Sequence, residues 1–174
     1  MARVLAISGS LRASSSNSAL IQAAALVAPS GVEVEIYEGL GGLPHFNPDY
    51  RDEESPQTVI ELRARLNNCD AVLICSPEYA HGVPGVLKNA LDWLVGSGEL
   101  VDKPVAIINA APRATHAHAS LLETITVMSG RIVHDASIAI PLAGRKLDAS
   151  GIAADPALAD LVVRALRALT RVIT

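Results

Sequence analysis

The sequence predicts an α/β protein in which one parallel β-sheet is covered by helices on both faces. Short apolar runs rich in Val and Ile alternate with longer segments of helical periodicity along the whole chain. These apolar runs carry almost no charged residues, which is typical of strands buried on both faces. The 174 residues can bury a substantial core, and we expect a single domain over residues 1–174.

The first part of the chain supplies two predicted strands and one helix. Residues 3–8 form a continuous, β-branched run that predicts a central strand. Residues 18–28 have helical periodicity and end before Pro29. Residues 32–37 alternate apolar and polar side chains, as a strand with one exposed face does. Residues 39–55 are rich in Gly, Pro, Asn and Asp and predict a long loop.

The middle of the chain continues the alternation. Residues 56–68 and 84–95 are predicted helices, and each begins with a proline, which suits a first helical turn. Ser55 is the candidate N-cap of the first of these helices. Residues 70–75 lie between them and predict another buried strand.

The last part of the chain completes a five-stranded pattern. Residues 104–109 predict a strand, 117–128 a helix, 130–140 a weaker strand and 156–173 a closing helix with Asp155 as its N-cap. Five strands joined by helices suit a flavodoxin-like three-layer sandwich with a parallel sheet of strand order 2-1-3-4-5. That order places a ligand at the carboxyl ends of the first and third strands.

Composition limits the possible partners. Half of the residues are hydrophobic and only 18% are charged, so we expect part of the surface to be buried in a homo-oligomer. The net charge is −4 and no basic stripe occurs, so nucleic acid is not an expected partner.

Location follows from features that the sequence lacks. It shows no signal-peptide layout and no apolar run long enough to span a membrane, which favours a cytoplasmic protein with no membrane partner. Cys69 and Cys75 lack the spacing of a zinc site or a CxxC pair, so we expect two buried thiols and no metal.

The loop after the first strand has the chemistry of a phosphate site. Residues 9–18 read Gly-Ser-Leu-Arg-Ala-Ser-Ser-Ser-Asn-Ser and precede a predicted helix, whose N-terminus offers unpaired N–H groups. Arg12 adds a charge-assisted hydrogen-bond fork, and Gly9 is expected to let the chain turn sharply. The loop is neither GxGxxG nor a P-loop, which favours a mononucleotide phosphate. A solvated loop with a serine N-cap is the alternative. The hydroxyls that can donate to phosphate oxygens are those of Ser10, Ser15 and Ser16.

The loop after the third strand suits a flat ring. Residues 76–85 read Ser-Pro-Glu-Tyr-Ala-His-Gly-Val-Pro-Gly, and their prolines and glycines fix a path that exposes backbone donors and acceptors. A flavin ring needs such groups along its polar edge, and Tyr79 can pack on or beside it. A plain strand-to-helix turn is the alternative.

Several other residues are weaker candidates. His116 and His118, with Arg113, suggest a small cationic site for a phosphate or an acidic substrate, although a solvated loop explains them more simply. Trp93 is a candidate for an oligomer interface, where aromatic residues are enriched. We assign no catalytic side chain.

The two loops resemble those of a known family. Gly9-Ser-Leu-Arg with Ser15 and Asn17 is similar to the G-S-x-R-x-x-S-x-N loop of the NADPH-dependent FMN reductases, which include quinone, azo-dye and chromate reductases. Residues 76–79, then Gly82 and residues 84–93, resemble the second signature of this family, and residues 43–49 resemble its loop after the second strand. The resemblance covers residues 3–122.

This resemblance implies specific roles. The residues implied to hold the FMN phosphate are Ser10, Arg12, Ser15, Ser16 and Asn17. Those implied to line the isoalloxazine are Pro77, Glu78, Tyr79, Ala80 and Gly82. A homodimer or homotetramer is also implied, in which residues 46–50 approach a neighbour's flavin. Two positions depart from the family: Ala80 replaces the usual Asn, and residues 109–118 are bulkier than its usual Gly- and Ser-rich loop.

The implied activity is FMN-dependent transfer of hydride from NADPH or NADH to the flavin, and of electrons onward to a small quinone, azo, oxyanion or flavin acceptor. The flavin carries this chemistry, so the protein has to supply only binding and orientation. A non-enzymatic FMN-binding electron carrier or a regulatory flavin module is the alternative. A flavin-free hydrolase is disfavoured because no activated nucleophile is visible.

Overall fold

Five parallel strands form one sheet in the order β2-β1-β3-β4-β5, which confirms the predicted flavodoxin-like topology. A computed structural model describes residues 1–50, 54–142 and 144–173. The strands are β1 (Ala2–Ser8), β2 (Val32–Tyr37), β3 (Ala71–Cys75), β4 (Pro104–Ile108) and β5 (Arg131–Ile132).

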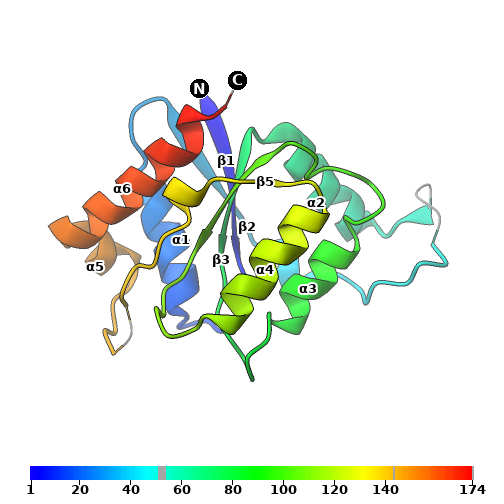
Figure 1. Cartoon of the computed structure of the whole chain (residues 1–174), viewed down its shortest axis with the longest axis horizontal. Helices are drawn as coiled ribbons and strands as arrows, with labels where there is room; N and C mark the ends of the chain where they lie inside the picture. Colours follow the sequence, from blue (N-terminus) through cyan, green and yellow to red (C-terminus); the bar gives the residue numbers. More distant parts are fainter. Residues whose placement is uncertain (51–53, 143, 174) are drawn as a thin grey trace.

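Helices cover both faces of the sheet, with α1, α5 and α6 on one side and α2, α3 and α4 on the other (Figure 1). The α-helices are α1 (Ser16–Leu26), α2 (Gln57–Asn68), α3 (Gly85–Asp92), α4 (His116–Val127), α5 (Ala149–Ala154) and α6 (Pro156–Arg171). Two short 3₁₀ helices are η1 (Gly39–Gly42) and η3 (His134–Ala136).

The central strands divide their side chains between two cores. In β1, Val4 and Ala6 are fully buried against α1 and α6, whereas Leu5 and Ile7 face α2 and α3. The same alternation runs along β3 and β4, because successive side chains of a strand point to opposite faces. Both cores are mainly aliphatic, and this explains why so few aromatic residues suffice.

Three local predictions need correction. Helix α1 begins two residues earlier than expected, because Ser15 and not a later residue caps it. Helix α2 begins after Pro56 with no side-chain cap, so the assignment of Ser55 as N-cap is wrong; its Oγ accepts a hydrogen bond from Arg63 instead. Helix α5 was not expected, and it packs against α1. Asp155 does cap α6, as predicted.

The long loop after β2 is fastened to α3. The Asn89 amide accepts a 2.8 Å hydrogen bond from Phe46 N and donates one of 2.9 Å to Pro44 O. Trp93 Nε1 donates to the same Pro44 oxygen at 2.9 Å. Trp93 is only 2% exposed beneath this loop, so the expectation that it lies at an oligomer interface is wrong. Residues 51–53 of the predicted loop lie outside the described residues.

No helix in the described ranges combines the length and the apolar character that a membrane crossing requires.

Candidate functional site

The loops that follow β1, β3 and β4 gather at one end of the sheet, at the bottom of Figure 1. The first two loops touch at Gly9, whose N–H donates a 2.9 Å hydrogen bond to Cys75 O. A Cβ atom at Gly9 would lie 2.8 Å from Ser76 Oγ, so only glycine allows this close approach. The chain bends at Gly9, as predicted, but without a positive φ, so close packing against Ser76 is the reason for glycine here.

Hydrogen bonds within the β1–α1 loop fix its shape. Ser15 Oγ accepts from Asn17 N at 3.2 Å and from Ser18 N at 3.4 Å, so it is the N-cap of α1. Ser10 Oγ accepts from Arg12 N at 3.3 Å. Both serines are more than nine-tenths buried, and each hydroxyl still has its own proton to donate.

The same loop holds a group of free backbone donors. Within the described part of the chain, five backbone N–H groups of this loop have no protein acceptor. They are those of Leu11, Ala13, Ser14, Ser15 and Ser16. The loop contains no acidic residue, and the exposed Arg12 guanidinium pairs with no described carboxylate. Consecutive N–H groups at a helix N-terminus attract an anion, so this loop suits a phosphate.

Asn17 lies beneath these donors and is 8% exposed. Its Oδ1 accepts a 3.2 Å hydrogen bond from Cys75 Sγ at the end of β3. Among the residues that the structure describes, its Nδ2 donates to none. The sequence singled out Asn17 as a candidate, and its link to β3, which depends on the tertiary fold, was not predicted.

The β3–α3 loop closes with a tight two-residue turn. Tyr79 N donates to Gly82 O at 3.1 Å, and Gly82 N donates to Tyr79 O at 2.9 Å. Between them, Ala80 has φ of 49° and His81 has φ of 62°. Two positive φ values are typical of a type I′ turn, which prefers Asn and Gly. Ala-His is not a usual pair in such a turn, so the turn was not predicted from the sequence.

Two side chains of this loop differ in availability. The ring of Tyr79 is 57% exposed, so it is free to pack against a ligand. Glu78 is engaged, because its Oε2 accepts a 2.8 Å hydrogen bond from Ala117 N in the first turn of α4. Thr115 makes no side-chain cap there, so Glu78 supplies the missing acceptor and joins the second loop to the third.

Backbone groups of the second loop remain available. The N–H groups of Glu78 and Ala80 find no acceptor among the described residues, whereas Pro77 O accepts a 3.0 Å hydrogen bond from Ser76 Oγ. The structure thus brings the predicted set from Pro77 to Gly82 close to the β1–α1 loop, with free donors in both.

The third loop is held rigidly by Asn109. The Asn109 amide donates to Ala114 O and accepts from Ala111 N, each at 2.8 Å. At the end of this loop the His116 ring stacks on His81, with centroids 4.1 Å apart and planes 7° apart. Burial lowers the pKa of His118, and its Nδ1 is buried without a partner in the described structure, so His118 is unsuited to the predicted cationic site.

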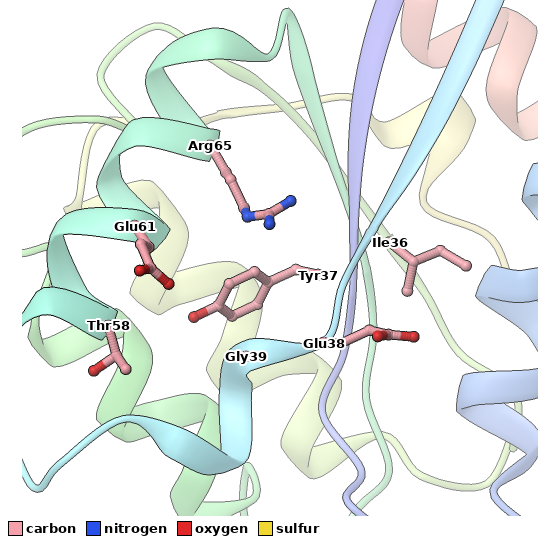
Figure 2. Close-up of a pocket in the computed structure, with 7 residues that line it drawn as sticks. All are labelled: Ile36, Tyr37, Glu38, Gly39, Thr58, Glu61 and Arg65. Carbon is pink, nitrogen blue, oxygen red and sulfur yellow. The ribbon is translucent and has the colours of Figure 1, made fainter.

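A separate hollow of about 140 Å³ lies at the edge of the sheet, between the end of β2 and α2 (Figure 2). Tyr37, Glu61 and Arg65 project into it. Arg65 already pairs with Glu35, and Glu38 adds a second carboxylate to the lining. With two carboxylates and one cation that is already paired, this hollow suits a phosphate less well than the strand ends do.

Comparisons with known proteins find flavin-dependent reductases. The model of the family described as NADPH-dependent FMN reductase matches residues 2–143. An NAD(P)H-dependent FMN reductase of Pseudomonas aeruginosa is 33% identical over 172 residues, covering 96% of this chain and 92% of that protein. A quinone reductase of Escherichia coli is 37% identical over 105 residues, which are 60% of this chain and 54% of that protein.

A solved structure of a flavoenzyme is also similar to this chain. The flavoenzyme NAD(P)H:(acceptor) oxidoreductase of Paracoccus denitrificans superposes with a TM-score of 0.74 at 26% identity, over 98% of each chain.

The tight turn predicts a stabilising substitution. Ala80→Asn should raise the free energy of unfolding by about 0.5–1 kcal/mol, because Asn tolerates positive φ better than Ala. Denaturant unfolding measures this change. As a matched control, the same substitution at the exposed Ala119 of α4 should lower stability, because Asn is a poorer helix former. A loss of stability with Ala80→Asn would contradict the assigned turn.

His118 predicts a pH dependence. Because burial lowers its pKa in the folded protein from 6.5, the unfolded chain binds the proton first as the pH falls. Stability should therefore decrease between about pH 7.5 and pH 5.5, and it should decrease less in His118→Gln. Urea unfolding of both proteins across this range tests the assignment, and equal pH slopes would refute it.

Proposed function

The chain belongs to the NADPH-dependent FMN reductase family, and from this premise we propose that it holds FMN across the ends of β1 and β3 and reduces a small quinone with electrons from NAD(P)H. Family membership makes the chain a flavin-dependent oxidoreductase, with FMN as its cofactor and NAD(P)H as its co-substrate. The placement of FMN and the choice of acceptor are the proposals.

One observation carries the placement of the phosphate. The N–H groups of residues 13–16 have no acceptor in the described protein, and they lie at the N-terminus of α1 beside Arg12, which pairs with no described carboxylate. A dianionic phosphate supplies the acceptors that these donors lack. The residues that would hold it are Ser10, Arg12, Ser15, Ser16 and Asn17.

The ring would lie against the β3–α3 loop. The free N–H groups of Glu78 and Ala80 can donate to its polar edge, and the exposed Tyr79 can pack beside it. Pro77 and Gly82 would complete the surface that the ring contacts. Because Ala80 acts through its backbone here, replacement of the family's usual Asn does not remove the donor.

The protein's part in catalysis is to bind and orient. Bound FMN supplies the two-electron chemistry by accepting hydride from NAD(P)H and passing electrons to an acceptor. Backbone donors fixed by hydrogen bonds stabilise negative charge on a reduced ring without reorganising. The rigid Asn109 loop lies beside the ring site and would shape the space that nicotinamide and acceptor share in turn.

A quinone is the acceptor class that the comparisons favour. The Escherichia coli relative is named a quinone reductase, although the chain spans only 54% of that protein. A quinone is flat and can stack on the same ring face as nicotinamide.

We also propose a homodimer or homotetramer in the cytoplasm, formed by one domain per chain. Phe46 and Tyr50 are 42% and 49% exposed, although both contact the buried Trp93 ring. If a second copy of the chain covered these rings, the FMN of that second copy would lie near this loop. Sedimentation velocity should find a particle larger than one chain.

Arg12 provides a direct test of the phosphate site. Arg12→Ala should weaken FMN binding by about 1.5–3 kcal/mol, because a charge-assisted hydrogen bond is lost. Fluorescence titration of the apoprotein measures this. Arg164→Ala, on the exposed face of α6, should leave the affinity unchanged. The same affinity in wild type and Arg12→Ala would remove Arg12 from the site.

The activity is tested by visible spectra of the FMN-loaded protein under anaerobic conditions. Addition of NADPH should bleach the flavin absorbance, and a benzoquinone should then restore it. A flavin colour that persists after NADPH and NADH would instead support an electron carrier.

A further inference from the structure

Cys75 lies where all three loops of the site meet. It is the last residue of β3 and is fully buried. Its Sγ donates a 3.2 Å hydrogen bond to Asn17 Oδ1, and the backbone of Ala110 hydrogen-bonds to the thiol. This one side chain thus connects the phosphate loop, the ring loop and the start of the third loop.

The thiol is held as a proton donor. Burial raises the pKa of Cys75 to about 12, so its S–H proton remains in place at neutral pH. A thiol in this state is a poor nucleophile and is not expected to react, which leaves hydrogen bonding and packing as its roles.

The bond to Asn17 determines which end of the amide is free. Oδ1 and Nδ2 are bonded to the same Cγ and lie in one plane. The hydrogen bond that holds Oδ1 against Cys75 therefore also fixes the direction of Nδ2. That Nδ2 belongs to a side chain 8% exposed, and within the described residues it has no acceptor. Nδ2 is not one of the fully enclosed polar atoms of the described structure, so it stays accessible at the loop surface, where a ligand oxygen can accept from it. Asn17 stands in the first turn of α1, beside the free N–H groups of residues 13–16.

We propose that Cys75 is a positioning residue for the phosphate of FMN: its thiol fixes the Asn17 amide so that Nδ2 donates to a phosphate oxygen. This inference rests on the proposed FMN site. It assigns a role in cofactor binding to a residue that does not itself touch the cofactor.

The experiment compares FMN with riboflavin, which has the same ring and no phosphate. Cys75→Val and Cys75→Ala remove the donor, and each should weaken FMN binding by about 3- to 10-fold while riboflavin affinity stays constant. Cys75→Ser keeps a donor and should bind FMN within about twofold of wild type. In an Asn17→Ala background, Cys75→Val should have no further effect on FMN affinity, because the two residues act as one unit.

Cys69→Val is the matched control. Cys69 is also a buried cysteine, 7% exposed, but its thiol donates to Leu66 O far from the three loops. This variant should keep wild-type FMN affinity even where it lowers stability, which separates general destabilisation from a specific effect. Thermal unfolding of every variant accompanies the titrations.

The outcomes are distinguishable. Equal losses of FMN and riboflavin affinity, unchanged FMN affinity in both Cys75→Val and Cys75→Ala, or a Cys75→Val effect that persists without Asn17 would each overturn the role of Cys75. If wild-type protein binds neither FMN nor riboflavin, the proposed function itself fails.

Discussion

The free backbone donors at the N-terminus of α1 are the constraint on which the site depends. A run of backbone N–H groups without a protein acceptor at a helix N-terminus favours the binding of an anion from outside the chain. The helix dipole and Arg12 add to this preference for an anion. In the proposed site, the sheet order would place the ring of an attached nucleotide at the neighbouring strand, where a second set of free donors lies.

Long-range contacts keep these donors in place. Gly9 allows the first two loops to touch, Cys75 joins Asn17 to Ala110, and Glu78 joins the second loop to α4. Each contact links residues far apart in the sequence, so the site is assembled only when the sheet is complete. A cofactor that carries its own chemistry requires such fixed surroundings more than it requires a reactive side chain.

The sequence predicted what is local and periodic. The strand order follows from alternating apolar runs and helices, and the candidate phosphate loop was chosen because serines and Arg12 stand before a helix. What it did not predict depends on tertiary contact. Nothing in Ala80-His81 indicates positive φ, and Trp93 is covered by a loop some fifty residues away in sequence, held at Pro44. Glu78 could be recognised as a helix cap only once α4 was placed beside it.

The most direct test of the account is an amide NMR titration of isotopically labelled apoprotein with FMN and, separately, with riboflavin. FMN should move the amide proton signals of residues 13–16 strongly downfield, because those N–H groups gain phosphate acceptors, and both ligands should shift the signals of residues 78–82. Signals of residues 13–16 that stay unmoved by FMN, or changes centred on the hollow beside Tyr37, would contradict it.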